Sequence, residues 1–444
     1  MLVYTSVTKS YIPKARVLAN SVKHFHPDWT FVLLFSDELP ADFDLAAEPF
    51  DEVLNIDQLG IADWKSWAFG HAVVELCTAV KGPAGELLAQ RPGVDKIMYL
   101  DPDIRVFSSL ESLERLLDTH EILLTPHLLE IETDLHAIMD NEISALKHGI
   151  YNLGFYAART SGQGLQFIRW WAQRLLVFCR DDIPGGLFTD QRWCDLAPAF
   201  FSGLCIVRDP GCNVATWNIA HRPLSKDAAG NFLVAGVPLR FYHFTSYDNG
   251  NGMGMLKRYA ANIEVAHELW DSYGQALKAA GQGDASLKTW AYAQFESGEA
   301  IPLAARRLYQ VRGDVRAVFP NPYNVAEPSF HSWWKDEVMQ AELRANATLV
   351  ANNAQLVEAA LTEQAAQASI AAEQARAVQL ALAASAGQAH PAHLVDNKRP
   401  RTVAGQLIRG VVSPGHAAHV TKLVFRVIKH EGLVGLLRRI RHYS

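Results

Sequence analysis

The chain has 444 residues, of which 49% are hydrophobic and 20% charged, and its formal net charge is −6. This length allows several domains with a large core, and the acidic balance argues against a dedicated nucleic-acid-binding protein, which would normally be basic. The five cysteines include no C-x-x-C pair, which argues against a zinc ribbon or a disulfide framework. The N-terminus does not resemble a signal peptide and no apolar run is long enough for a transmembrane helix, so we expect a cytoplasmic protein.

The first part of the chain alternates apolar strand segments with helical ones. Residues 1–6 and 30–38 predict strands, and apolar residues recur with helical spacing over 16–25. Such a strand–helix–strand unit implies parallel strands joined by right-handed crossovers. The pattern continues with helices over 63–90, a strand over 96–103, a helix over 111–120 and a strand over 121–128.

Further strands over 149–159 and 238–245 are separated by a long helix over 163–180. The alternation of strands and helices fades near residue 275. We therefore predict an α/β domain over 1–275, with a mostly parallel sheet flanked by helices.

The composition of the chain changes after this domain. Residues 276–334 predict a small helical or irregular annex, interrupted by four prolines, and 335–387 form a Gly- and Pro-poor run of helix-forming residues. A partial seven-residue spacing there favours a coiled coil that sets a homo-oligomeric state, and a solvated helix packed on its own chain is the alternative. Residues 388–418 read as a linker. Residues 419–444 predict a basic amphipathic helix that binds an anionic membrane surface or docks on the catalytic domain.

Two aspartates follow the apolar strand "KIMYL". Asp101 and Asp103 are therefore expected at the carboxyl end of a buried strand, where ligands bind in open α/β sheets. Two carboxylates so close repel each other unless a cation joins them, and Mg²⁺ and Mn²⁺ prefer such oxygen ligands. The alternative is an ordinary Asp-Pro turn.

A histidine and a glycine-rich segment follow the last predicted strand. His243 is a candidate third ligand, and an imidazole ligand suits Mn²⁺ better than Mg²⁺. Glycines in "NGNGMG" allow backbone N–H groups to approach a phosphate, and Lys257 just beyond is a candidate to neutralise it. A core histidine and a solvated lysine are the structural alternatives.

Polar residues also stand within the apolar segments "YNLGF" and "GGLFTDQRW". Asn152 is an amide suited to bind hydroxyl groups, and Gly154 permits close approach of a ligand. Asp190 and Gln191 lie between aromatic residues, so they are either buried and hydrogen-bonded for structure or directed into a cleft.

The order of "YTS", "TAVKGPAGELL", "YLDPD", "YNLGF", "FTDQ" and "HF" resembles the nucleotide-diphospho-sugar glycosyltransferases of the GT-A fold. The similarity is greatest to the retaining glycosyltransferase family 8 and its bacterial relatives, and it covers roughly residues 1–260. It implies a Rossmann-like, mixed, mostly parallel sheet, followed here by the long C-terminal helical region. Two departures stand out: the family's acid in the first loop is missing, and Ser246 and Asn249 replace the Gly and Lys of its closing motif.

The resemblance also implies roles for particular residues. The nucleotide base is expected at Thr5, Ser6 and Tyr11, and the donor sugar nucleotide at Lys81. By the same resemblance, Asp101, Asp103 and His243 hold Mn²⁺ or Mg²⁺, Asn152 contacts the sugar, and Asp190 and Gln191 lie beneath the anomeric carbon.

The sequence thus predicts a metal-dependent glycosyltransferase that uses a nucleotide-diphospho-sugar, UDP-linked, and retains stereochemistry. The expected acceptor is a glycan or lipid-linked glycan of bacterial surface polysaccharide synthesis. A sugar-nucleotidyltransferase is the enzymatic alternative, but it would normally carry glycines after the first strand, where "YTSVTKSYIP" has none. A catalytically inactive scaffold built on the coiled coil is the non-enzymatic alternative.

Overall fold

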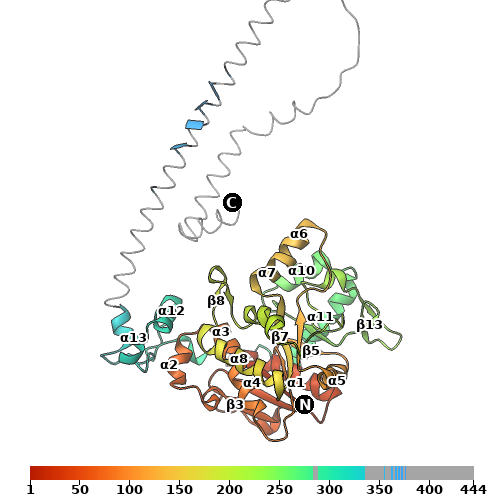
Figure 1. Ribbon diagram of the computed structural model, residues 1–444, viewed down its shortest axis with the longest axis horizontal. Helices are drawn as coiled ribbons and strands as arrows, with labels where there is room; N and C mark the ends of the chain where they lie inside the picture. The colour runs from red at the N-terminus through yellow and green to blue at the C-terminus, as the bar shows by residue number, and fades with distance from the viewer. Residues whose placement is uncertain are drawn as a thin grey trace, which may run out of the picture. The chain divides into compact units, whose positions relative to one another are not determined.

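The computed structural model describes residues 1–283 and 289–335, together with isolated residues between 355 and 376 (Figure 1). Met1–Ala347 form one compact unit and Thr348–Ser444 a second. Apart from Lys335 and those isolated residues, the predicted helix over 335–387 lies outside the described residues. The predicted linker over 388–418 and the predicted basic helix over 419–444 also lie outside them.

A seven-stranded sheet forms the centre of the first unit. Its strand order is β10-β6-β7-β4-β1-β2-β3, and β7 runs antiparallel to both of its neighbours while the other pairs are parallel. The predicted mixed, mostly parallel sheet is confirmed. The strands are β1 (Leu2–Val7), β2 (Thr30–Phe35), β3 (Glu52–Asn55), β4 (Lys96–Leu100), β6 (Ile122–Pro126), β7 (Tyr151–Arg159) and β10 (Leu204–Ile206).

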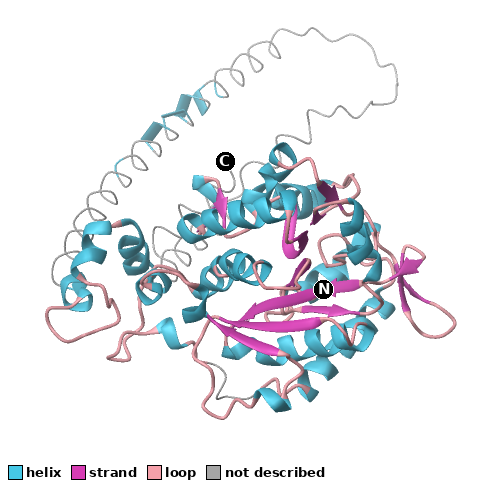
Figure 2. Cartoon of the chain, turned by 60° about the horizontal axis from the view of Figure 1, so that its bottom comes forward, coloured by secondary structure: helices cyan, strands magenta, loops and turns pink. Residues whose placement is uncertain are grey.

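Helices cover both faces of this sheet (Figure 2). Because side chains alternate along a strand, Val3 packs under one layer and Tyr4 under the other. The Val3 face is covered by α1 (Ile12–Phe25) and α5 (Glu111–Thr119). The Tyr4 face is covered by α2 (Trp64–Phe69), α3 (Val73–Ala79), α4 (Lys81–Ala89) and α8 (Gly162–Phe178).

Close contact between α4 and α8 depends on a glycine. A Cβ atom at Gly82 would lie 2.6 Å from the Cα of Ala172, a distance that real Cβ atoms do not adopt. The backbones of the two helices can therefore approach closely only without a side chain at this position. This contact fixes the N-terminal end of α4, where Lys81 begins the helix.

The annex packs into the same compact unit as the sheet. It contains α12 (Leu303–Val311), α13 (Gly313–Val318) and α14 (Phe330–Trp333). Its aromatic residues surround Phe69 of α2, and the buried Arg306 donates hydrogen bonds to the carbonyl oxygens of Phe69, His71 and Tyr292. The boundary predicted at residue 275 stays a prediction.

A further set of elements lies outside the main sheet. It comprises β5 (Ile104–Val106), β8 (Asp181–Asp182), β9 (Leu187–Phe188), β11 (Leu224–Lys226), β12 (Phe232–Val234), β13 (Val237–Pro238), β14 (Phe241–His243), α6 (Leu135–Ala137), α7 (Ile143–His148), α9 (Ala197–Phe200), α10 (Asn251–Tyr259) and α11 (Ile263–Ala279). The predicted strand over 238–245 contains the shorter β14, which pairs with β5 rather than with the main sheet. Among the described helices, none is long and apolar enough to cross a membrane. All five cysteines are free thiols.

Candidate metal and substrate site

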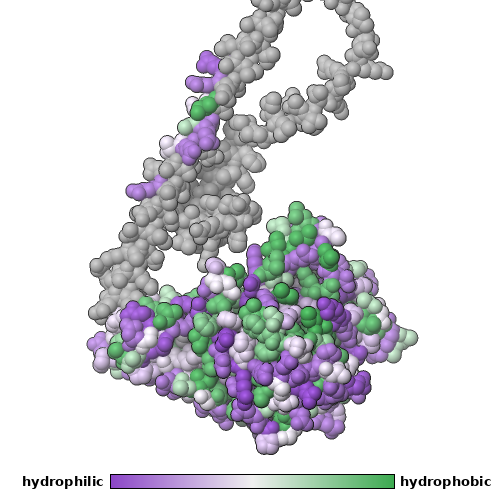
Figure 3. Space-filling view, in the orientation of Figure 1, coloured by the Kyte–Doolittle hydropathy of each residue, from purple (hydrophilic) through white to green (hydrophobic). Residues whose placement is uncertain are grey.

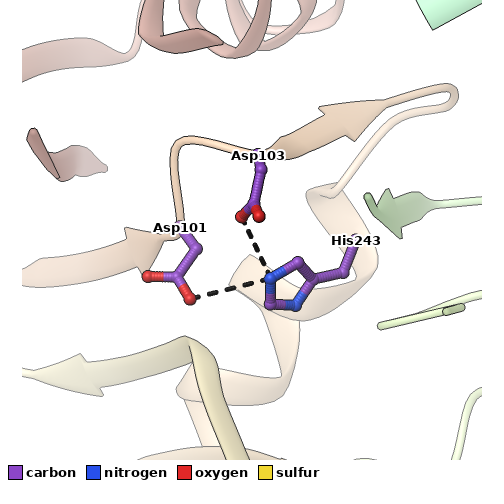
Figure 4. A group of neighbouring side chains, drawn as sticks. All are labelled: Asp101, Asp103 and His243. Atoms are coloured by element: carbon purple, nitrogen blue, oxygen red, sulfur yellow. Dashed lines mark ion pairs between the residues drawn. The ribbon is translucent and has the colours of Figure 1, made fainter. Parts of the chain in front are cut away.

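Asp101, Asp103 and His243 come together just beyond the carboxyl end of β4 (Figure 4). Nε2 of His243 lies 3.0 Å from Oδ1 of Asp103 and 3.7 Å from Oδ2 of Asp101. One ligand atom from each residue falls within 4.8 Å of the others, a spacing that allows all three to bind one ion. Within the part of the chain that the structure describes, this is the cluster of acidic and histidine side chains suited to hold a metal.

Backbone pairing explains why these residues meet although they are distant in sequence. The antiparallel register of β14 and β5 sets His243 opposite Ile104, the residue after Asp103. The N–H of Phe244 donates to the carbonyl oxygen of Asp103 at 2.8 Å, and the N–H of Asp101 donates to that of Gly154 at 2.8 Å. The two aspartates are thus fixed on one side by β14 and on the other by β7.

The chemistry of the donor set fits a divalent cation. Burial opposes the charged form of His243, but the carboxylates of Asp103 and Asp101 together outweigh it and raise the pKa of the imidazole. Nδ1 of His243 lies 3.2 Å from Oδ1 of Asn152, so an N–H there leaves Nε2 directed at the carboxylates. Two carboxylates and one oriented imidazole suit Mn²⁺, and the carboxylates also suit Mg²⁺.

A buried lysine joins the metal cluster to the predicted catalytic pair. Nζ of Lys81 lies 3.0 Å from Oδ1 of Asp101 and 2.9 Å from Oδ2 of Asp190. It also donates to the carbonyl oxygen of Leu153 at 3.2 Å and lies 4.4 Å from the centre of the Tyr99 ring. Burial opposes its charge, but the two carboxylates raise its pKa, so Lys81 remains a cation bound on every side.

These groups line one cavity of about 690 Å³. Of the residues that the sequence singled out, Ser6, Tyr11, Lys81, Asp101, Asp103, Asn152, Gly154, Asp190, Gln191 and His243 all line it. Thr5 does not: it is fully buried in β1, and its hydroxyl has no hydrogen-bond partner among the described residues. Lys257 is exposed on α10 and does not line the cavity either. A larger groove along α1 and α11 shares no residue with this cavity.

The Asp190–Gln191 pair is buried and held by the protein. Burial raises the pKa of Asp190 against the opposing effect of Lys81. The amide of Gln191 donates to the carbonyl oxygen of His148 at 2.9 Å, and the indole N–H of Trp171 donates to that of Asp190 at 2.9 Å. The pair thus combines a structural anchor with a place on the cavity wall.

The cavity contains polar residues that the sequence did not single out. His127 follows β6, and its Nε2 lies 3.2 Å from Nδ2 of Asn152. Burial lowers the pKa of His127 to about 4, so its ring is neutral near pH 7. Trp217 packs edge-on against both His127 and His243, and its indole N–H has no partner among the described residues. The rule applied to Asp101, that ligands bind beyond strand ends, would have identified His127.

One wall of the cavity comes from the π-helical turn η4 (Ile138–Glu142) and α7. Asn141, Ser144 and His148 from this segment line the cavity. Apolar residues between positions 131 and 150 are exposed instead, and the space-filling view shows an apolar patch over α6 and α7 (Figure 3). These exposed residues are Ile131, Leu135, Met139, Ile143, Leu146 and Ile150.

Comparisons with curated proteins give relatives of unassigned activity. No family model matches the chain. The uncharacterized protein YfnF of Bacillus subtilis (strain 168) is 26% identical over 163 residues, which are 36% of this chain and 52% of the relative. YfnD of the same organism is 30% identical over 101 residues, 22% of this chain and 32% of the relative. The chain thus spans about half of the length of one relative and about a third of the other.

Solved structures of glycosyltransferases are similar to the chain at low identity. The galactosyltransferase LgtC, in complex with donor and acceptor sugar analogues, has a TM-score of 0.36 and 15% identity, and covers 64% of this chain and 98% of its own. GlyE of Streptococcus pneumoniae TIGR4 has a TM-score of 0.34 and 16% identity, with coverage of 62% and 63%. Mouse xyloside xylosyltransferase 1 has a TM-score of 0.34 and 14% identity, with coverage of 55% and 97%. Likenesses at these TM-scores carry no conclusion about activity.

Proposed function

We propose that this protein is a metal-dependent glycosyltransferase that uses a nucleotide-diphospho-sugar, UDP-linked, as its donor. The observation that carries the proposal is the convergence of Asp101, Asp103 and His243 with the Lys81–Asp190 ion pair in one cavity. A divalent cation bound there supplies positive charge to a departing diphosphate, which is the main electrostatic requirement of this reaction.

Different residues of the cavity wall suit different parts of such a donor. Ser6 and Tyr11 stand at the end of β1, where we propose that the nucleoside binds. Asn152 and the neutral His127 offer hydrogen bonds to sugar hydroxyls without adding charge near the reacting centre. Gly154 leaves room beside them, because a Cβ atom there would lie 2.6 Å from Cε1 of His243.

We assign the reacting carbon of the sugar to the side of the cavity formed by Asp190 and Gln191. Positive charge develops on the sugar ring as the diphosphate leaves, and a buried carboxylate or amide oxygen stabilises it. The ion pair with Lys81 opposes the rise that burial causes in the pKa of Asp190, and it holds the carboxyl group in one position. A retaining outcome follows if the acceptor attacks from the side that the diphosphate leaves.

The acceptor is proposed to be a glycan or lipid-linked glycan of bacterial surface polysaccharide synthesis. Val73 and Val74 of α3 are exposed and line the cavity, so an acceptor with an apolar part would find a suitable surface there. We also propose a cytoplasmic location, a membrane contact through 419–444 and self-association through 335–387, all of which rest on the sequence patterns of those segments.

A thermal-shift panel of UDP-, GDP- and dTDP-sugars, each with Mn²⁺ or with EDTA, tests the proposed donor. A ligand that binds only the folded protein stabilises it by about 2.7 kcal/mol at a hundredfold excess over Kd. We expect UDP-sugars with Mn²⁺ to raise the melting temperature and the EDTA samples to show little change. An equal shift in EDTA would contradict the metal requirement. A response to nucleoside triphosphates alone would favour a nucleotidyltransferase.

A further inference from the structure

Lys14 of α1 is a buried cation close to the proposed metal site. Its side chain is 5% exposed, and Nζ lies 2.6 Å from Oδ2 of Asp248 and 4.1 Å from the centre of the Tyr11 ring. Lys14 thus connects helix α1 to the segment that follows β14. Asp248 is 45% exposed, so its carboxylate loses little hydration in this pair.

Lys14 packs against the wall of the cavity, although it does not itself line it. Tyr11, Asp103 and Ser246 line it, and Tyr11 lies directly beneath the ammonium group. Burial opposes the charge of Lys14, but Asp103 is the largest of the effects that raise its pKa, and Lys14 in turn lowers the pKa of Asp103. The geometry that places Lys14 beside the site is its contact with the ring of Tyr11, a residue that lines the cavity.

The other candidate cations either contact carboxylates already or lie outside the cavity. Among the described lysine and arginine residues, Lys81 alone lines the cavity. Its ammonium group already contacts two carboxylates and a carbonyl oxygen. His243 faces Asp101 and Asp103. Lys257, the cation that the sequence favoured for a phosphate, is exposed outside the cavity. A diphosphate adds further negative charge to this site, and one ion at Asp101 and Asp103 does not offset it fully.

We propose that Lys14 binds the diphosphate of the donor and that Asp248 holds its ammonium group in place until the donor arrives, an inference that rests on the proposed function. The diphosphate then competes with Asp248 for Lys14. In the family that the sequence resembles, the closing motif after β14 carries a lysine, and Asn249 stands at that position here. The proposal assigns the missing cation to Lys14 of α1 instead.

The proposal predicts effects of opposite sign for the two partners. Removing Lys14 takes away a charge-assisted contact to phosphate, so Lys14→Ala should weaken diphosphate binding by about 10–100-fold. Removing the charge of Asp248 frees Lys14, so Asp248→Asn should leave binding unchanged or tighten it. If the pair only fastens α1 to the segment after β14, both variants should weaken binding alike.

Titration calorimetry of the full-length protein with Mn²⁺ and three probes, UDP, inorganic diphosphate and uridine, distinguishes these cases. Lys14→Ala should lose affinity for UDP and diphosphate but not for uridine, and Lys14→Arg should restore part of it. Lys23→Ala is the matched control, because Lys23 is also on α1 and ion-paired, with Asp51 at 2.6 Å, but neither Asp51 nor its other partner Trp29 lines the cavity. Melting curves show whether each variant is folded.

Unchanged diphosphate affinity in a folded Lys14→Ala protein would overturn the proposal. Weaker binding in Asp248→Asn would overturn it too, and this variant keeps the test decisive even if Lys14→Ala does not fold. If the wild-type protein binds neither UDP nor diphosphate with Mn²⁺, the proposed function itself fails. Loss of diphosphate affinity that is confined to the Lys14 variants, by contrast, supports both the role of Lys14 and the proposed function.

Discussion

At the scale of single residues, the site is built from side chains whose partners are fixed by the fold. Lys81 illustrates this, since one ammonium group serves Asp101 of the metal cluster and Asp190 of the opposite wall. Truncating one member of a buried ion pair leaves the other charge uncompensated, which typically costs about 3–5 kcal/mol. Variants at Lys81 therefore report on stability as much as on ligand binding.

Gly154 offers a cleaner residue-level test of the metal cluster. The Cβ atom of a Gly154→Ala variant would lie 2.6 Å from Cε1 and 2.8 Å from Nδ1 of His243, so the imidazole must move. Changes that displace an oriented metal ligand typically cost 10–100-fold in metal affinity, and we expect a loss of about that size for Mn²⁺ by calorimetry. Gly254→Ala is the control, because nothing lies within 4 Å of its Cβ position and it should bind Mn²⁺ normally. Equal affinity in both variants would contradict this account of His243.

The sequence revealed those site residues that stand in recognisable surroundings. Asp101 and Asp103 follow an apolar strand, and His243 precedes a glycine-rich segment, so strand-end reasoning found them. Lys14 was missed because one lysine in an amphipathic helix looks like an ordinary solvated residue; its partner Asp248 is over 230 positions away. Conversely, Lys257 was favoured from proximity in sequence, and α10 turns it away from the cavity.

At the scale of elements, long apolar segments were predictable and short ones were not. β1, β2, β4, β6 and β7 are buried along nearly their whole length and show as apolar runs. β3 has four residues, of which one is buried, and β10 has three, all half-buried, so hydrophobic periodicity gives little signal. The pairing of β14 with β5 is a tertiary feature that no local pattern specifies.

The junction of α2, α3 and the annex contains a buried titratable group, which makes its stability depend on pH. His71 is 1% exposed; one ring nitrogen contacts the carbonyl oxygen of Trp67 at 2.9 Å, and Nε2 has no partner among the described residues. Burial lowers its pKa to about 4, and the cations Arg306 and Arg307 act in the same direction. At pH values below the histidine pKa of the unfolded chain, about 6.5, the unfolded chain binds a proton that the native state does not. The free energy of unfolding therefore decreases as the pH is lowered.

For His71 alone, this linkage lowers the free energy of unfolding by about 2 kcal/mol between pH 7 and pH 5. Urea unfolding at the two pH values should show that His71→Gln loses less stability on acidification than the wild type does. The exposed His24→Gln controls for the loss of an imidazole and should retain the wild-type pH dependence. An unchanged pH dependence in His71→Gln would mean that the buried ring is not the group that titrates.

At the scale of the whole molecule, one compact unit carries every residue assigned to the site. Met1–Ala347 include the sheet, the cavity and the annex. The composition after residue 335 predicted a helical region distinct from the α/β part, but composition alone does not identify a binding partner. The oligomer and membrane contacts proposed for 335–387 and 419–444 therefore rest on sequence pattern, whereas the site rests on distances between side chains.

The most direct test of the central claim is the release of UDP from a UDP-sugar by the purified protein, measured with Mn²⁺ and with EDTA. We predict release with Mn²⁺ that EDTA abolishes, and loss of nearly all release in a folded Asp103→Ala variant, because that variant removes the carboxylate nearest to His243. Undiminished release in EDTA, or from Asp103→Ala, would contradict the assignment of this cavity as a metal-dependent sugar-transfer site.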